Sequence, residues 1–371
     1  MEIICNEKKC TACLACINKC HKGAINLKTD KFGRNIAVID KDKCVDCGAC
    51  KQVCPNNRNV FFNSSIACYA ARTKNNEIKE ICSSGGVATT IGEYIIKNNG
   101  IYFGATYFPT EIVQCRSVNE VRNTSGSKYI ESNTSNSYSE VYSELKKGKF
   151  VVYSGTPCQI AGLISFLGGE QEKLLTIDLV CHGMPPVEYL EYYLSCKKIQ
   201  ADNISFRKKD AWRLQAFVKN KVVWETDSYL DAYYNMFMDG MIFRENCYEC
   251  PYAQEKRVSD LTIGDFWGIQ KENLKYAYDG NISLILINTE KGKAFFGKIK
   301  NLFTYENRPI EEAIKGNDQL RHPSERNEYR RQFERLVYRK GWKFALNYNK
   351  IANDKRKIRI VNKIKKIIRQ K

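Results

Sequence analysis

Cysteines within the first 54 residues are spaced so that several thiolates can converge on one metal group. They form two runs of the pattern C-x2-C-x2-C-x3-C: Cys10, Cys13, Cys16 and Cys20, then Cys44, Cys47, Cys50 and Cys54. Three thiolates on one tight loop suit three irons of a 4Fe-4S cluster, and in chains with two such clusters the last cysteine of each run binds the other cluster. The predicted ligand sets are therefore Cys10, Cys13, Cys16 and Cys54 for one cluster, and Cys44, Cys47, Cys50 and Cys20 for a second.

A pair of zinc sites is the alternative use of these cysteines, and the spacing disfavours it. Zinc usually takes two ligands from each C-x2-C knuckle, whereas each run here supplies four thiolates. Pro55 follows the second run, but His21 stands where the first run would usually have proline. Because proline at that position shapes the turn and binds no iron, both clusters are still expected to form.

Four cysteines in the rest of the chain lie next to Gly or Pro, or at a predicted strand end, where a backbone can bend around a metal. They are Cys158, Cys181, Cys247 and Cys250. Their spacing leaves three interpretations open, namely a third 4Fe-4S cluster, a zinc site, or ordinary buried cysteines. The remaining isolated cysteines are expected to be small buried apolar residues. These are Cys5, Cys68, Cys82, Cys115 and Cys196.

Iron-sulfur clusters imply a second redox group in the same chain. They pass one electron at a time, whereas most metabolic substrates exchange two, and a flavin (FAD or FMN) converts between the two. Two turns of small residues before predicted helices, at 83–86 and 154–156, could bind its phosphates. Each turn alone is also explained as a helix cap. No G-x-G-x-x-G motif follows a strand, which argues against a Rossmann-type nicotinamide site.

The elements that must position these residues divide into three segments. Residues 1–62 are predicted to form a dicluster 4Fe-4S domain with a hairpin that turns at 30–33. Residues 65–320 are predicted to form a larger α/β flavoprotein domain around a mixed sheet, and residues 321–371 a basic helical tail. The fold class is therefore α+β.

Hydrophobic periodicity locates the elements of the larger domain. Strands are expected at 101–106, 112–118, 150–153, 174–181, 215–224 and 283–288. Helices are expected at 87–97, 139–147, 159–167, 187–198 and 228–243. The segment 122–139, which is rich in Asn, Ser and Thr, is expected to be a loop over the sheet.

Composition excludes several classes of protein. With 43% hydrophobic and 12% aromatic residues in 371, the chain is too apolar to be disordered, and three histidines leave little imidazole for hydrolase triads. No apolar run of about 18 residues occurs, and the N-terminus has no signal core. A cytoplasmic protein, or one peripheral at the inner face of the membrane, is expected, and in that compartment thiols favour metal binding over disulfides.

The net charge of +18 is concentrated near the end of the chain. Residues 321–371 contain 18 Lys or Arg and four Asp or Glu, which amounts to +14. The last part, 354–371, is predicted to be a helix with isoleucines and one valine on one face and mostly basic residues elsewhere. Such a helix could dock an acidic partner or an anionic membrane surface, or pack on its own domain. Nucleic-acid binding through Tyr329, Phe333, Tyr338 and Trp342 is the least favoured use of this segment.

Six short motifs between residues 83 and 268 occur in a specific order. They are Ser83-Ser84-Gly85-Gly86, Ser127-Lys128-Tyr129, Ser154 to Gln159, Asp178 to Gly183, Cys247 to Cys250, and Thr262 to Gly268. Together they resemble the coenzyme F420 hydrogenase/dehydrogenase beta-subunit family over roughly residues 65–300. The resemblance does not extend to the basic tail.

The resemblance implies an iron-sulfur flavoprotein that binds FAD and exchanges electrons with a deazaflavin or another acceptor. It implies that Cys158, Cys181, Cys247 and Cys250 hold a third 4Fe-4S cluster beside the flavin. It also implies a set of residues in contact with FAD: Ser84, Gly85, Gly86, Lys128, Gly155 and Thr156. Lys128 would stabilise negative charge on the flavin or its pyrophosphate, unless it is only a surface lysine. Cys82 replaces an expected serine, which puts one polar contact to the flavin in doubt.

Further residues are candidates for the substrate end of the same site. Asp265 and Trp267 could close the flavin pocket, although a tryptophan after a strand is also typical of a core. Arg207, Lys209 and Trp212 could form a rim that binds an anionic substrate, and the alternative is a solvated run of charges. The sequence identifies no catalytic residue.

The predicted activity is that of an iron-sulfur, flavin-dependent oxidoreductase. FAD would exchange electron pairs with coenzyme F420 or a similar compound, and single electrons would pass through the 4Fe-4S clusters to ferredoxin or another redox subunit. One alternative is a ferredoxin-fed reductase of a metabolite in cell-surface polysaccharide biosynthesis. The other is a non-catalytic binding role of the basic tail.

Overall fold

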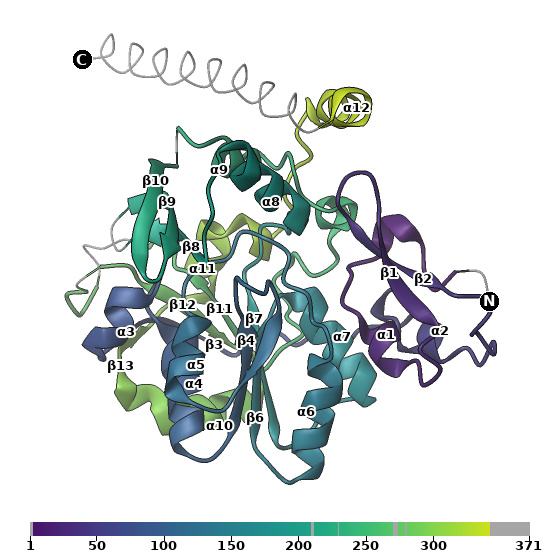
Figure 1. Ribbon diagram of the computed structural model, residues 1–371. Helices are drawn as coiled ribbons and strands as arrows, with labels where there is room; N and C mark the ends of the chain where they lie inside the picture. Colours follow the sequence, from purple (N-terminus) through teal and green to yellow (C-terminus); the bar gives the residue numbers. More distant parts are fainter. Residues whose placement is uncertain (1–2, 209–210, 229, 270–273, 279, 342–371) are drawn as a thin grey trace.

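The computed structural model describes residues 3–208, 211–228, 230–269, 274–278 and 280–341. Figure 1 shows a small N-terminal unit, the head, lying beside a larger body that is built on a sheet with helices on both faces. None of the described helices has the length and apolar composition needed to cross a bilayer.

The head contains the predicted hairpin. Strand β1 (Ile25–Thr29) pairs antiparallel with β2 (Asn35–Ile39). The carboxylate of Asp30 accepts hydrogen bonds from the backbone N–H groups of Phe32, at 2.8 Å, and Arg34, at 2.9 Å. This Asx-type turn fixes the register of the two strands, as a short polar turn between apolar runs predicts.

Each cysteine run of the head begins on a loop and ends on a short helix. Helix α1 (Ala15–Lys19) follows Leu14, whose φ is 57°, and α2 (Ala49–Val53) follows Gly48, whose φ is 76°. These left-handed residues turn the chain sharply between the second and third cysteines of each run. Three cysteines of one run can therefore face a common point.

Eight strands form the main sheet of the body. They are β3 (Ala67–Thr73), β4 (Ile101–Ala105), β5 (Ile112–Cys115), β6 (Val151–Gly155), β7 (Leu174–Leu179), β11 (Leu261–Asp265), β12 (Ser283–Ile287) and β13 (Phe303–Asn307). Their order across the sheet is β13-β3-β12-β11-β7-β6-β4-β5. Neighbours from β4 to β11 pair parallel, and the outer strands pair antiparallel. The predicted mixed α/β architecture is confirmed.

Helices cover both faces of this sheet (Figure 1). They are α3 (Asn76–Ile81), α4 (Val87–Lys97), α5 (Val118–Asn123), α6 (Ser137–Lys146), α7 (Pro157–Leu167), α10 (Glu290–Ile299) and α11 (Ile310–Gly316). On β6, Val152 packs in the core under α4 and α10, whereas Val151 and Tyr153 pack towards α6 and α7. The head packs against α7, and its buried residues belong to the same core as Val151 and Tyr153.

A second, smaller sheet lies above the main one. Strands β8 (Asn203–Lys208), β9 (Ala211–Val218) and β10 (Lys221–Asp227) form an antiparallel meander. The single strand expected at 215–224 is therefore wrong, because the chain reverses at Lys219 and Asn220. Their φ values of 48° and 62° are those of a tight hairpin turn, which the flanking β-branched residues concealed.

Helices α8 (Val187–Cys196) and α9 (Ala232–Met238) pack with this sheet in a separate core. The helix expected at 228–243 is shorter than predicted. Asp231 caps its start by accepting a hydrogen bond from the N–H of Tyr234, and Gly240, with a φ of 61°, lies just beyond its end. Short 3-10 helices complete the described chain at Glu7–Lys9, Pro55–Asn57, Glu245–Glu249, Lys300–Leu302 and Asp318–Leu320.

The described part of the basic segment forms α12 (Arg330–Lys340), which packs on the body. Phe333 and Val337 are buried in the same core as α8 and α9, so Phe333 is not available for stacking on a nucleic acid. The amphipathic helix predicted at 354–371 and the residue Trp342 lie outside the described residues.

Gly85 allows the loop before α4 to lie against the sheet. A Cβ atom at this position would lie 2.2 Å from the carbonyl oxygen of Ala71 and 2.7 Å from the backbone nitrogen of Ser283. The Gly85→Ala variant is therefore expected to lose about 1–3 kcal/mol of unfolding free energy. The matched control is Gly297→Ala in α10, where a Cβ meets nothing within 4 Å and a gain of about 0.8–1 kcal/mol is expected. Urea denaturation measures both, and equal effects would contradict the close contact.

Candidate functional site

The four cysteines predicted to bind the first cluster line one cavity. Cys10, Cys13, Cys16 and Cys54 surround a volume of about 140 Å³ in the head, so the last cysteine of the second run joins the first run. Burial raises the pKa of Cys13 to about 12. A hydrogen bond from Cys5 lowers the pKa of Cys10 to about 5 and that of Cys54 to about 7, against the effect of burial.

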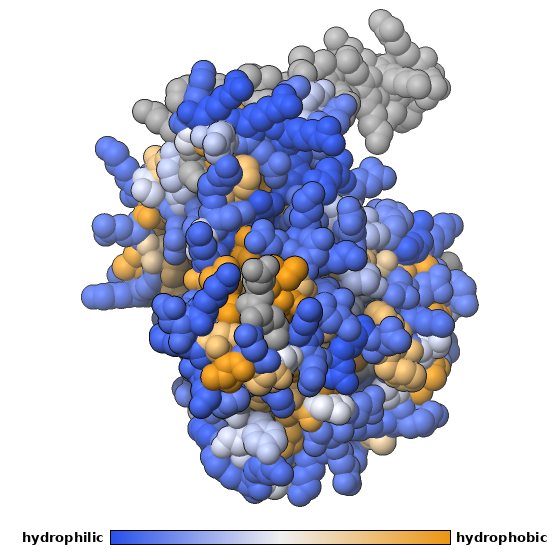
Figure 2. Space-filling model, turned by 90° about the vertical axis from the view of Figure 1, so that its right-hand side faces the viewer, coloured by the Kyte–Doolittle hydropathy of each residue, from blue (hydrophilic) through white to orange (hydrophobic). Residues whose placement is uncertain are grey.

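The four cysteines predicted for the second cluster lie nearer the surface. Electrostatic interactions connect Cys50 with Cys20 and Cys44, although burial is the main cause that raises the pKa of Cys50. Cys47 is exposed. Figure 2 shows the side of the molecule that carries the head, a mostly hydrophilic surface with a few apolar patches. Val45, two residues from Cys47, is 58% exposed on the head.

The four remaining candidate cysteines also meet. Cys158 lies in the first turn of α7, Cys181 follows β7, and Cys247 and Cys250 lie on and after the 3-10 helix at Glu245–Glu249. They line a cavity of about 30 Å³. Burial raises the pKa of each thiol, for Cys247 to about 12. Four thiols brought together from distant parts of the chain are the donor set that a third cluster requires.

Zinc at these cysteines stays an open alternative to a third cluster. Within the parts of the chain that the structure describes, no group of three or more His, Cys, Asp or Glu side chains is arranged to hold a single metal ion. Zinc requires four ligands at about 2.0–2.3 Å from one point.

Two buried arginines border the third cysteine cavity, and the sequence motifs did not reveal them. Arg257 is paired with Asp178 at 3.1 Å, and both side chains are almost fully buried. Arg244 is paired with Glu131 at 2.9 Å and also donates to the carbonyl oxygen of Cys10 at 3.2 Å. Arg244 therefore connects the loop of the first cysteine run with the third cavity.

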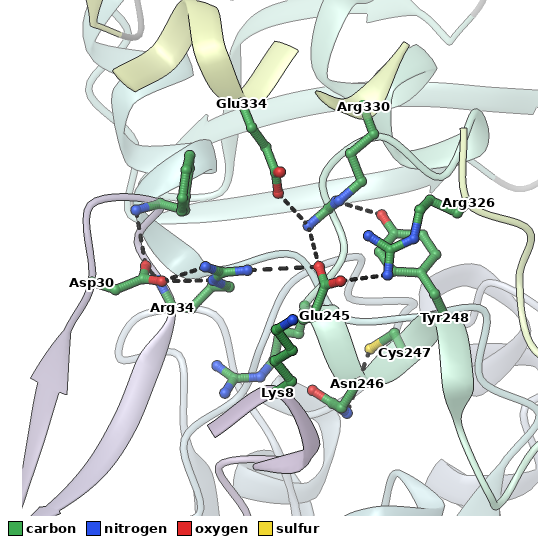
Figure 3. A network of polar contacts seen from close by, with 12 residues as sticks. Lys8, Asp30, Arg34, Glu245, Asn246, Cys247, Tyr248, Arg326, Arg330 and Glu334 are labelled. Carbon is green, nitrogen blue, oxygen red and sulfur yellow. Dashed lines mark hydrogen bonds and ion pairs between the residues drawn. The ribbon is translucent and has the colours of Figure 1, made fainter. Parts of the chain in front are cut away.

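Glu245 joins three parts of the chain next to the third cavity (Figure 3). Its carboxylate is paired with Arg34 of the head hairpin at 3.8 Å, and with Arg330 of α12 at 3.5 Å. Arg326 donates a hydrogen bond to the same carboxylate. Although burial acts to raise it, these arginines, Arg326 foremost, hold the pKa of Glu245 below its usual value. The loop that carries Cys247 is thereby tied to both the head and α12.

A cavity of about 640 Å³ lies at the carboxyl ends of the parallel strands. Ligands bind at this edge in open α/β sheets. Five of the six residues predicted to contact FAD line it: Ser84, Gly86, Lys128, Gly155 and Thr156. The sixth, Gly85, is buried beside the sheet, and its N–H donates to the hydroxyl of Ser283 at 2.8 Å. Gly85 thus shapes the loop instead of lining the cavity.

Lys128 lies in the loop expected at 122–139, and this loop forms one wall of the large cavity. Its ammonium donates to the carbonyl oxygens of Thr124 at 2.8 Å and Ser125 at 2.9 Å. Burial lowers the pKa of Lys128 to about 7. The lysine is therefore neither a free surface residue nor a fully solvated cation.

The other end of the large cavity is aromatic. Trp212 and Trp267 line it, with ring centroids 5.5 Å apart, and so does Asp265, the last residue of β11. Arg207 is buried, forms an ion pair with Asp265, and lies 4.4 Å from the ring of Trp212. Because Asp265 neutralises the charge of Arg207, this arginine is not free to bind an anionic substrate at the rim. It is also not part of a solvated run of charges, because it is buried. Lys209 lies outside the described residues.

The three cavities adjoin one another. Thr11 lines both the head cavity and the third cysteine cavity. Cys181 and His182 line both the third cysteine cavity and the large cavity. A continuous series therefore leads from the strand-edge cavity to the head, with Cys181 at the first boundary and Thr11 at the second.

The isolated cysteines only partly fit the expectation of burial. Cys68 and Cys115 are buried, as predicted. Cys82 is half-buried in the wall of the large cavity, and Cys196 is exposed near the end of α8. Cys5 is half-buried in the head cavity, so it is not an ordinary core residue.

These cysteine-lined cavities beside a strand-edge cavity define an iron-sulfur redox protein of mixed α/β architecture. Residues 9–57 match the family model of the 4Fe-4S dicluster domain. Residues 148–313 match the family model for the C terminus of the beta subunit of coenzyme F420 hydrogenase/dehydrogenase. The resemblance seen in the motifs is thus confirmed: residues 148–313 are similar to this beta-subunit family of oxidoreductases, and residues 9–57 to a 4Fe-4S dicluster domain.

Comparison with whole proteins gives less information about this chain than the two family models do. No curated protein matches the chain. Among solved structures, the chain is similar to a chain of the F420-reducing NiFe hydrogenase complex from Methanosarcina barkeri, studied by xenon derivatization. The sequence identity is 15%, the match covers 72% of this chain and 97% of that chain, and the TM-score is 0.47.

Proposed function

We propose that this protein is an iron-sulfur flavoprotein that moves electrons between a two-electron compound, coenzyme F420 or a similar molecule, and a one-electron carrier such as ferredoxin. In this proposal FAD binds in the large cavity, Cys158, Cys181, Cys247 and Cys250 hold a third 4Fe-4S cluster, and two clusters lie in the head. The adjoining series of cavities carries the proposal, because electron transfer requires that redox groups lie close together.

The residues of the large cavity suit a flavin dinucleotide. The small residues Ser84 and Gly86 lie before α4, whose N-terminal amides favour phosphate. Thr156 and Gly155 lie at the start of α7 in the same wall, and Lys128 supplies a cation. When bound, the flavin would exchange electrons in pairs or singly. The side chains at the aromatic end would exclude water and leave space for a second, planar ligand.

The cysteines and arginines between the cavities suit charged clusters. Arg244 and Arg257 border the third cysteine cavity, and because each is paired with a buried carboxylate, they would hold the loops around thiolate-bound iron without adding net charge. Arg244 also holds the loop of the first cysteine run through the carbonyl oxygen of Cys10. Exposed Cys47 places the second head site where an external carrier can approach, and Val45 offers an apolar contact beside it.

Anaerobic purification tests the cofactor inventory. We expect about 12 irons, a similar amount of acid-labile sulfide and one FAD per chain, since three clusters contain four irons each. About eight irons would remove the third cluster, and absence of both iron and flavin would overturn the proposal.

Stopped-flow mixing separates this function from the reduction of a metabolite. Protein reduced by ferredoxin is expected to be reoxidised by coenzyme F420 within one turnover. No response to coenzyme F420, with intact cofactors, would favour the ferredoxin-fed metabolite reductase, for which the aromatic end of the cavity would be the substrate site. The basic segment is proposed to dock an acidic partner or a membrane surface.

A further inference from the structure

Cys5 is a fifth cysteine at the site of the first head cluster. It lies five residues before Cys10 and outside the two cysteine runs. Its side chain lines the same cavity of about 140 Å³ as the four predicted ligands. It is hydrogen-bonded to the side chains of Cys10, from the first cysteine run, and Cys54, from the second. Five thiols therefore surround a site that needs four.

The segment that carries Cys5 is held in place. Ile4 is buried, and its carbonyl oxygen accepts a hydrogen bond from the side chain of Asn57 at 2.8 Å. The carbonyl oxygen of Asn6 accepts hydrogen bonds from the backbone N–H groups of Lys9, at 2.9 Å, and Cys10, at 3.1 Å. Contacts on both sides of Cys5 thus fix its backbone next to the cavity.

We propose that Cys5 is a reserve ligand of the first head cluster, able to replace Cys10 or Cys54 at iron. The inference rests on the proposed function only in that the head binds clusters. In the exchange, the bond from iron to the sulfur of Cys10 breaks and a bond to the sulfur of Cys5 forms. The thiol proton of Cys5 moves to the departing Cys10 sulfur along their hydrogen bond, and no electron is gained or lost.

The geometry limits the exchange to two of the four ligands. The hydrogen bonds of Cys5 run to Cys10 and Cys54. Cys13 and Cys16 lie beside and in α1, and burial is the main influence on both thiols. Replacement of Cys13 should therefore not be rescued, which gives the experiment an internal control.

The test uses the full-length chain, reconstituted without air, and measures iron, sulfide and the EPR spectrum after reduction. Cys10→Ala is expected to keep wild-type iron and to show shifted g values, because one ligand has changed. The double variant Cys5→Ala/Cys10→Ala is expected to lose about four irons, the content of one cluster. Cys54→Ala, alone and with Cys5→Ala, repeats the comparison at the second position.

Two controls decide the outcome. Cys5→Ala alone should keep all its iron, and Cys13→Ala should lose about four irons whether or not Cys5 is present. If Cys10→Ala and Cys54→Ala lose as much iron as the corresponding double variants, or if Cys5→Ala alone loses a cluster, the reserve role is overturned. Wild-type protein that binds no iron in the head would instead overturn the proposed function itself.

Discussion

Replacement of Arg257 by methionine is expected to lower the free energy of unfolding by about 3–5 kcal/mol, because it leaves a charge buried without its partner. That charge belongs to Asp178, which is fully buried and lies 3.1 Å from the guanidinium. The same guanidinium donates to the carbonyl oxygens of Tyr252, at 3.0 Å, and Leu179, at 3.2 Å. These residues lie two positions from Cys250 and Cys181 respectively, so the variant should also lose the third cluster that we propose at these cysteines.

Denaturation followed by tryptophan fluorescence measures the loss of stability, and iron analysis measures the loss of the cluster, about four irons. The matched control is Arg213→Met, which removes a partly exposed pair with Glu225 and Asp227 and should change stability far less, because solvent screens such pairs. Adding Asp178→Asn to Arg257→Met should recover part of the stability. Equal stabilities of Arg257→Met and Arg213→Met would show that the buried pair is not the cause.

The affinity for FAD is expected to fall as the pH rises above about 7. Burial lowers the pKa of Lys128 to about 7, so the lysine loses its charge above that pH when no anion is bound. A bound phosphate raises this pKa, and the affinity should fall up to tenfold per pH unit until the pKa of the complex is reached. In the protein without FAD, the pH dependence of the folding stability has the opposite sign to that of the FAD affinity. Stability should rise between about pH 7 and pH 10.4, because the unfolded chain binds the extra proton.

Titration calorimetry of FAD-free protein at several pH values measures this dependence. Lys128→Arg keeps its charge over the whole range, so its affinity should be nearly independent of pH between about 7 and 9. Lys128→Met should bind FAD about 10- to 100-fold more weakly at pH 6.5, the cost of one charge-assisted hydrogen bond. The exposed Lys293→Met, on α10, serves as the control. An unchanged pH profile in Lys128→Arg would remove Lys128 from the phosphate site.

The sequence was most informative where the chemistry is local. The two cysteine runs identify the head because each ligand lies within a few residues of the next, and the pairing of Cys54 with the first run agrees with the cavity. Partners distant in sequence were not found. Arg244 meets Glu131 across 113 positions and Arg257 meets Asp178 across 79, and no periodic pattern indicates such pairs.

Several strands were missed for a related reason. Strand β3 contains three alanines and Arg72, a composition that is not typical of a strand, yet it pairs on both sides within the main sheet. Strands β8, β11 and β13 were also not predicted. They are short, and it is their neighbours in the sheet, not their own propensity, that stabilise them.

Residues outside a repeated pattern carry the weakest signal in the sequence. Cys5 was expected to be an ordinary apolar residue because it falls outside the C-x2-C pattern. Its position next to the first run was the only available signal. Gly85, in contrast, belongs to a motif, but its role is to let the loop approach β3 and β12.

The position of Glu245 has a consequence for the order in which the protein matures. The ribosome has made both cysteine runs of the head by residue 54, whereas two of the arginines that hold Glu245, Arg326 and Arg330, emerge after almost all of the described chain. The loop that carries Cys247 gains its full support only then. We therefore expect assembly in two stages, in which the head folds first and the segment of Cys247 reaches its final arrangement only after Arg326 and Arg330 have been made.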